Sequence, residues 1–182
     1  MSQFDSKITL VTGGVRSGKS SYALKQAESY PNRRLFIATA PSTDGSMSQR
    51  IQKHQHERNH KFWTTLEEEH ELPERISELE EPYSVLVIDC LTLWLSNLLL
   101  RDNTLDEDSV SDYASELLTS ICKINANAYL VTNELGMSVH PPTELGRRFQ
   151  DLQGRLNQEI AKASDNVVLL VSGMVLPLQK IP

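Results

Sequence analysis

Short apolar runs recur along the chain and alternate with longer segments in which apolar and polar residues mix. The apolar runs predict β-strands at residues 8–12, 34–39, 84–89, 128–132 and 167–172. The segments between them predict helices at residues 19–30, 46–60, 91–100, 109–125 and 142–163. Continuous apolar strands are typical of a sheet that is covered on both faces. The alternation therefore predicts an α/β fold, with a parallel sheet, right-handed crossovers and flanking helices.

The stretch from residue 41 to residue 81 breaks this pattern because it has little apolar periodicity. We expect it to form a flap or excursion beside a functional site rather than part of the core. The acidic runs at residues 67–71 and 78–81 are expected to be solvated.

Length and composition restrict the possible classes of protein. The 182 residues predict a single domain, spanning 1–182, with a core of its own. The formal net charge of −6 disfavours extended binding to nucleic acid, which requires a basic face. No membrane span or signal peptide is recognisable, so we expect a cytoplasmic protein. Cys90 and Cys122 lie in apolar stretches and are expected to be buried thiols.

The most informative motif directly follows the first predicted strand. Residues 13–20 fit the phosphate-binding loop (P-loop) pattern of Gly, four residues, Gly-Lys-Ser/Thr. A strand before the loop and a helix after it place backbone N–H groups at a helix N-terminus, where phosphates bind. A glycine-rich turn without function is the alternative. The predicted nucleotide-binding residues of the loop are Gly13, Gly14, Val15, Arg16, Ser17, Gly18, Lys19 and Ser20.

A second acidic feature complements the loop. The strand predicted at residues 84–89 ends in Asp89, and in P-loop proteins an acid at this position holds Mg²⁺ directly or through water. The alternative for Asp89 is an N-cap of the following helix. We expect Ser20 and Asp89 to bind Mg²⁺ and Lys19 to reach the β- and γ-phosphates.

A histidine between two arginines is the third candidate for chemistry. If residues 46–60 are helical, Arg50, His54 and Arg58 lie along one face of that helix. The arginines would offset negative charge on a phosphate and disfavour the imidazolium, which keeps the ring nucleophilic. His54 is therefore a candidate nucleophile toward phosphorus. A solvated surface histidine is the alternative.

Several segments together resemble the bifunctional adenosylcobinamide kinase/adenosylcobinamide-phosphate guanylyltransferase family of cobalamin biosynthesis. The resemblance covers nearly the whole chain in order. The segments that carry it are 12–20, 37–40, Arg50-Ile51 with His54 and Arg58, 63–67, 89–99, 131–136 and 146–158. It implies a RecA-like P-loop fold, the substrates GTP and ATP, Mg²⁺, adenosylcobinamide and its phosphate as partners, and a homotrimer.

The resemblance also implies roles for particular residues. It makes His54 the residue that is guanylylated on nitrogen. His54 and Lys19 are therefore the two predicted catalytic residues. The further nucleotide contacts that it implies are Ala38, Thr39, Ala40, Gln55, His56, Glu57, Arg58, Glu67 and Asp89.

One loop departs from the family pattern. Ser138 and His140 stand where the family usually has a glycine and an apolar residue, so a backbone that needs positive φ would be strained at Ser138. Two other functions are weighed against this one. A P-loop kinase of another small metabolite would leave the arginine–histidine face unused, and a nucleotide-dependent switch would usually carry an Asn-Lys-x-Asp guanine motif, which the sequence lacks.

Overall fold

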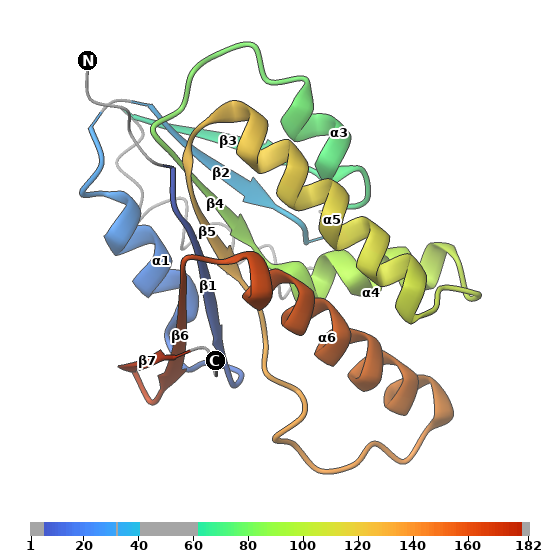
Figure 1. Ribbon diagram of the computed structural model, residues 1–182. Helices are drawn as coiled ribbons and strands as arrows, with labels where there is room; N and C mark the ends of the chain where they lie inside the picture. Colours follow the sequence, from blue (N-terminus) through green and yellow to red (C-terminus); the bar gives the residue numbers. More distant parts are fainter. Residues whose placement is uncertain (1–5, 32, 41–61, 180–182) are drawn as a thin grey trace.

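A seven-stranded sheet with helices on both faces forms the centre of the molecule (Figure 1). The structure is a computed structural model that describes residues 6–31, 33–40 and 62–179. The strands are β1 (Ile8–Gly13), β2 (Arg34–Ala38), β3 (Trp63–Glu67), β4 (Val85–Asp89), β5 (Asn127–Val131), β6 (Asn166–Val171) and β7 (Met174–Leu178). The helices are α1 (Lys19–Ala27), α3 (Leu72–Ser77), α4 (Leu91–Arg101), α5 (Glu107–Ile124) and α6 (Glu144–Ala163).

The strand order is β3-β2-β4-β5-β1-β6-β7, and every neighbouring pair is parallel except β6 and β7. The predicted parallel sheet is thus confirmed, with one antiparallel edge strand that the sequence did not predict. Strand β5 lies between β1, which leads into the P-loop, and β4, which ends in Asp89. The carboxyl ends of these strands meet at one edge of the sheet, which we call the carboxyl edge. In an open α/β sheet, ligands bind at this edge.

Alternate residues of each strand face opposite sides of the sheet and build two apolar clusters. Leu10, Ile37 and Ile88 belong to the larger cluster, together with buried residues of α3, α4, α5 and α6. Val11 and Val87 belong to the smaller cluster, which includes buried residues of α1. The sheet is therefore covered on both faces, as the apolar strands predict.

The expectation that residues 41–81 stay outside the core is wrong for their second half. Strand β3 pairs with β2 in parallel, and α3 buries Leu72 and Ile76 completely. Only Trp63 and Leu66 of β3 are shielded, and only in part, so the strand shows no continuous apolar run. The helix predicted at residues 46–60 lies outside the described residues.

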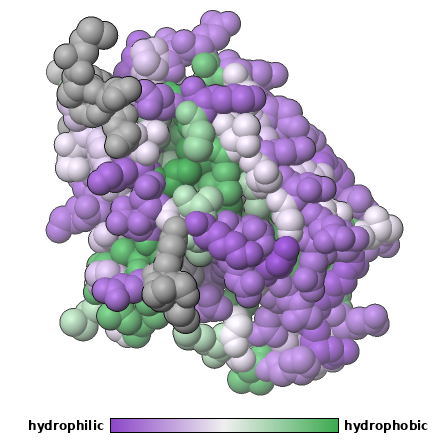
Figure 2. Space-filling model, in the orientation of Figure 1, coloured by the Kyte–Doolittle hydropathy of each residue, from purple (hydrophilic) through white to green (hydrophobic). Residues whose placement is uncertain are grey.

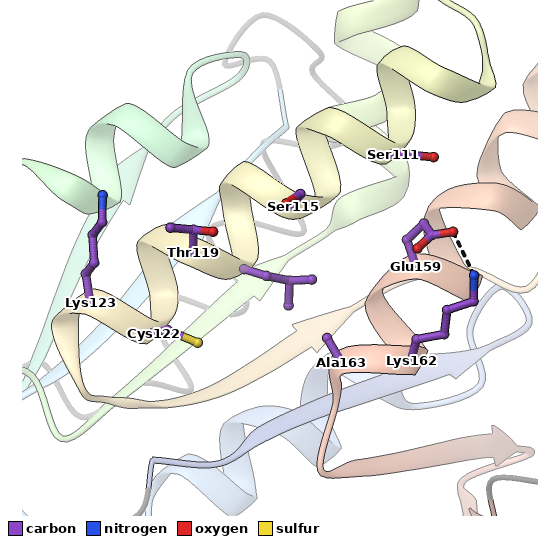
Figure 3. A pocket seen from close by; sticks show the side chains of 9 residues that line it. Ser111, Ser115, Thr119, Cys122, Lys123, Glu159, Lys162 and Ala163 are labelled. Atoms are coloured by element: carbon purple, nitrogen blue, oxygen red, sulfur yellow. Dashed lines mark hydrogen bonds and ion pairs between the residues drawn. The ribbon is translucent and has the colours of Figure 1, made fainter. Parts of the chain in front are cut away.

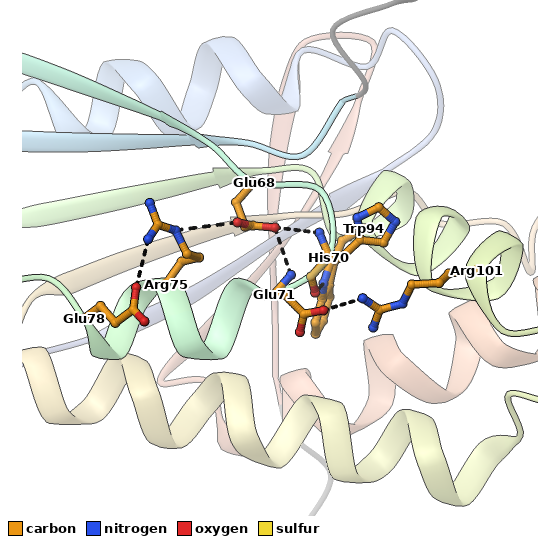
Figure 4. Close-up of polar contacts among 7 residues, drawn as sticks. All are labelled: Glu68, His70, Glu71, Arg75, Glu78, Trp94 and Arg101. Carbon is orange, nitrogen blue, oxygen red and sulfur yellow. Dashed lines mark hydrogen bonds and ion pairs between the residues drawn. The ribbon is translucent and has the colours of Figure 1, made fainter.

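Polar contacts fix the connection between β3 and α3 (Figure 4). A carboxylate oxygen of Glu68 accepts the backbone N–H groups of His70 and Glu71, each at 2.9 Å. The indole N–H of Trp94 on α4 donates to the backbone carbonyl of His70 at 2.8 Å, and Arg101 pairs with Glu71. The acidic run at 67–71 therefore includes ordered contacts and is not simply a solvated face.

The surface departs from expectation at the cysteines. Cys122 is exposed on α5 rather than buried, and Cys90 is partly shielded. Apolar residues gather over the hairpin of β6 and β7 (Figure 2), where Met174 is 76% exposed. Across the described residues, the helices lack the length and apolar character needed to cross a membrane.

Candidate active site

The P-loop connects the end of β1 to the start of α1, as the motif predicts. Gly13 has φ +148°, and a Cβ atom there would lie 2.4 Å from the backbone oxygen of Leu170. Gly18, which precedes the first residue of α1, has φ +99°. Both positions therefore require glycine, because other residues would be strained there or would collide with β6. The loop reaches the carboxyl edge with Gly14, Val15 and Arg16 exposed to solvent.

Lys19 is buried beneath the loop. Its ammonium donates to the backbone carbonyl of Gly13 at 2.9 Å and to that of Gly14 at 2.6 Å. Burial lowers the pKa of Lys19, and the nearby carboxylate of Asp89 opposes that shift. The ammonium is thus held by loop carbonyls at the position from which a P-loop lysine reaches the phosphates.

Asp89 is the last residue of β4, at the carboxyl edge. Strand β4 is separated from β1 only by β5, and the Asp89 carboxylate acts to raise the pKa of Lys19. The Ser20 hydroxyl in the first turn of α1 and the Asp89 carboxylate are oxygen ligands of the kind that could hold Mg²⁺, which takes one or two protein oxygens together with phosphates. Within the described parts of the chain, no cluster of three or more His, Cys, Asp or Glu side chains could hold a metal ion.

Thr39 joins the end of β2 to the residue after β4. Its hydroxyl donates to the carbonyl of Cys90 and accepts the backbone N–H of Cys90, both at 2.8 Å. Its carbonyl accepts a hydrogen bond from the Asn97 side chain at 2.9 Å. Thr39 is fully buried, and the neighbouring Ala38 and Ala40 are buried as well. The structure gives the Thr39 side chain a role in joining β2 to β4.

Cys90 directly follows Asp89, but its thiol is not activated. Burial raises the pKa of Cys90 to about 12, and the adjacent Asp89 carboxylate adds to this effect. The thiol therefore stays protonated near neutral pH, which excludes it as a thiolate nucleophile.

Strand register places Glu67 level with the other candidates. Ala38 is paired with Glu67 on one side and with Asp89 on the other. Strand β3 lies four positions from β1 in the sheet, which is about 19 Å at the usual strand spacing. Glu67 therefore lies at the same edge as the P-loop but far along it.

A buried polar cluster, which sequence reasoning missed, links β5 to α6. Asn157 accepts hydrogen bonds from the Thr132 hydroxyl at 2.7 Å and from the Gln153 side chain at 2.9 Å. Its amide nitrogen donates to the backbone carbonyl of Asn133 at 3.0 Å, and the Asn133 N–H donates to the Thr92 hydroxyl at 2.8 Å. Thr92 thereby joins the first turn of α4 to this cluster. The sequence does contain a sign of this cluster. Gln153 and Asn157 are four residues apart among apolar residues of α6, so their amides lie on one buried face of that helix.

The remaining predicted site residues lie outside the described residues. These are His54, Gln55, His56, Glu57 and Arg58, together with Arg50, which was expected to share a helix face with His54. Their roles stay predictions. The loop that departs from the family pattern is described, and Ser138 is not among the residues with positive φ. The expected strain at Ser138 is therefore absent.

A groove between α5 and α6 lies away from the P-loop (Figure 3). Its lining includes Cys122, Lys162 and Ala163 near the C-terminal ends of these helices. Those ends lead into β5 and β6, so this part of the groove lies near the amino ends of the strands. It is therefore not part of the site at the carboxyl edge.

The fold and the loop define a P-loop nucleotide-binding protein. A similar solved structure is that of a KaiC-like protein from Pyrococcus horikoshii, with a TM-score of 0.52 and 15% sequence identity. The match covers 90% of this chain and 70% of that one, and at this identity it shows the fold alone.

Sequence comparisons identify the family. The model of the cobinamide kinase/cobinamide phosphate guanyltransferase family matches residues 9–178, and the chain belongs to this family of enzymes. A bifunctional adenosylcobalamin biosynthesis protein, CobP of Pseudomonas aeruginosa, is 39% identical over 95% of this chain and 98% of its own length. Two bifunctional adenosylcobalamin biosynthesis proteins called CobU are also similar to this chain. The one from Escherichia coli is 35% identical and the one from Salmonella typhimurium 37% identical, each over 91% of this chain and 96% of its own length. The resemblance in the sequence is thereby confirmed.

Proposed function

We propose that this chain phosphorylates adenosylcobinamide and then transfers GMP to the resulting phosphate, giving adenosylcobinamide-GDP. Family membership supports the pair of reactions. The observation that carries the proposal for this chain is Lys19, whose buried ammonium lies against the P-loop carbonyls and near Asp89. A phosphate chain bound at this loop would serve both reactions.

In the first reaction, the hydroxyl on the aminopropanol arm of adenosylcobinamide attacks the γ-phosphorus of ATP or GTP. The bond from that phosphorus to the β–γ bridging oxygen breaks, and the nucleoside diphosphate leaves. Lys19 and the N–H groups of the P-loop hold the phosphates and offset their charge. Mg²⁺, bound by Ser20 and Asp89, would add further charge neutralisation.

In the second reaction, neutral His54 attacks the α-phosphorus of GTP and pyrophosphate leaves. The P-loop holds the β- and γ-phosphates and so becomes a cradle for the leaving group. A phosphate oxygen of adenosylcobinamide phosphate then attacks the same phosphorus, the P–N bond breaks, and the imidazole is released. Two easier displacements replace one difficult transfer, as in other covalent catalysis.

The other parts of the proposal follow the family resemblance. The further nucleotide contacts are Ala38, Thr39, Ala40, Gln55, His56, Glu57, Arg58 and Glu67. The hydroxyl, N–H and carbonyl of Thr39 are bonded to Cys90, Asp89 and Asn97, so we assign to Thr39 a packing contact with the nucleotide rather than a hydrogen bond. We also propose that the chain acts in the cytoplasm as a homotrimer.

The test is covalent labelling with GTP that carries a radioactive α-phosphate. We expect a protein adduct that is labile in acid and stable in alkali, as a phosphoramidate is. His54→Ala should abolish it, whereas the matched control His56→Ala should retain it. A label that persists in His54→Ala and disappears in His56→Ala would move the nucleophile to His56. No label in the wild-type protein would contradict guanylyl transfer through histidine.

A further inference from the structure

The peptide unit between Asn133 and Glu134 connects two distant parts of the chain. Its N–H, from Glu134, donates to the backbone carbonyl of Gly13 in the P-loop at 3.1 Å. Its C=O, from Asn133, accepts the side-chain amide of Asn157 on α6 at 3.0 Å. One peptide unit thus bridges the P-loop and α6, and both of its polar groups are bonded.

The orientation of Asn157 is fixed by its other contacts. Its amide oxygen accepts from Thr132 and Gln153, so its nitrogen is directed to the Asn133 carbonyl. Asn157 is 8% exposed and Gln153 is fully buried. A buried amide held by three partners has little freedom to turn, so the peptide unit that it holds is fixed as well.

The Gly13 carbonyl is the point at which this bridge meets the phosphate site. It accepts both the Glu134 N–H and the Lys19 ammonium. An ammonium has three donors, so Lys19 can keep both loop carbonyls and give its third hydrogen to the phosphates. The Gly13 carbonyl is buried and can orient the ammonium in this way only while the carbonyl itself is held in place. The Glu134 N–H holds it.

We infer that Asn157 is a positioning residue for triphosphate binding. It holds the Asn133–Glu134 peptide, whose N–H fixes the Gly13 carbonyl, so that this carbonyl keeps the Lys19 ammonium oriented toward the phosphates. Asn157 therefore sets the affinity for the triphosphate through α6 and β5. The inference rests on the proposed binding of GTP at residues 13–20.

The test compares Asn157→Leu with Gln150→Leu. Both variants remove an amide side chain from α6, but Gln150 bonds the Leu135 carbonyl and the Ser138 hydroxyl and touches neither Asn157 nor the Asn133–Glu134 peptide by a hydrogen bond. Titration calorimetry at a temperature where both variants are folded should show GTP affinity about tenfold weaker for Asn157→Leu, and little changed for Gln150→Leu. Equal weakening in both variants, or none in either, would overturn the inference. Failure of the wild-type protein to bind GTP would instead contradict the proposed function.

A second measurement uses the wild-type protein and does not depend on whether a variant folds. Hydrogen exchange followed by NMR should find the Glu134 N–H protected both without nucleotide and with GTP bound, because the Gly13 carbonyl accepts it in both states. Rapid exchange of that N–H in the GTP complex would overturn the inference.

Discussion

Apolar packing holds the middle of the sheet, whereas polar side chains that bond to backbone groups hold its carboxyl edge. In the middle, Leu86 and Ile88 are completely buried among aliphatic neighbours. At the edge, Thr39, Asn97 and Asn157 each bond backbone groups of other segments. Apolar contacts are non-directional, while hydrogen bonds fix orientation. The middle therefore supplies most of the stability, and the edge places the groups that meet the nucleotide.

This difference predicts that a substitution can lower activity without lowering stability, or the reverse. The largest such effect is expected at Lys19. We expect Lys19→Met to lower both phosphoryl and guanylyl transfer by roughly a thousandfold, because the charge that faces the phosphates is lost. The Gly13 carbonyl keeps its bond from Glu134, so the urea midpoint of the unliganded protein should hardly change. Full guanylylation by the variant would show that the two reactions do not share the loop.

A substitution in the middle of the sheet should give the opposite result. Leu86→Ala removes a side chain with 0% exposure, and its loss should cost about 2–5 kcal/mol in the free energy of unfolding. The variant molecules that remain folded should bind GTP with unchanged affinity. Urea unfolding and calorimetry at low temperature would check this, and weakened GTP binding by folded protein would contradict the division between middle and edge.

A smaller effect is expected at the start of α6, on the approach to the edge. The Thr143 hydroxyl accepts the backbone N–H of Gly146 at 3.1 Å and so caps the helix. Thr143→Ala should cost about 1 kcal/mol in urea unfolding. Because Gln153 and Asn157 lie about three and four turns further on, GTP affinity should be retained. A large loss of affinity would mean that the first turn contributes to the site.

The smallest effect is expected at Glu68, a partly buried carboxylate that, like the buried amides, bonds backbone N–H groups. Burial acts to raise the pKa of Glu68, but the N–H groups of His70 and Glu71, with help from Arg75, lower it overall from the ordinary value of 4.5. A lowered carboxyl pKa stabilises the fold above the unfolded pKa, and this contribution is lost as the pH falls through the folded pKa. Glu68→Gln keeps an acceptor but loses the charge.

We therefore expect wild-type protein to be more stable than Glu68→Gln by about 0.5 kcal/mol at pH 7, because solvent screens the charge. The difference should shrink as the pH falls below 4.5 and vanish once the pH lies below the lowered pKa of Glu68 in the folded protein. Urea unfolding at several pH values would measure it. A difference that grows on acidification would contradict the assigned direction of the pKa shift.

Burial also decides which strands can be predicted from the sequence. Strands β1, β2, β4 and β5 are recognisable because burial on both faces gives nearly continuous apolar runs. Strand β6 is recognisable by its apolar run as well, although only Val168 and Leu170 are buried. Strands β3 and β7 are the outermost strands of the sheet, where fewer side chains are covered. All five residues of β7 are exposed, so nothing in their burial distinguishes them from a loop.

Some residues of the site can likewise be predicted from the sequence, and others cannot. The P-loop and Asp89 are predictable because each depends on a short local pattern at the end of a strand. Asn157 and Gln153 are not, because their partners lie about twenty residues or more away and are defined only when α6 packs against β5. The amide pair is visible in the sequence, but its partners are not.

The product of the complete reaction tests the central claim most directly. Wild-type protein incubated with GTP, Mg²⁺ and adenosylcobinamide should convert the corrinoid to adenosylcobinamide-GDP, identified by mass spectrometry through the added phosphate and GMP. Lys19→Met should give neither this product nor the phosphorylated intermediate at a comparable rate. A wild-type reaction that consumes GTP but leaves the corrinoid unmodified would contradict the proposed function.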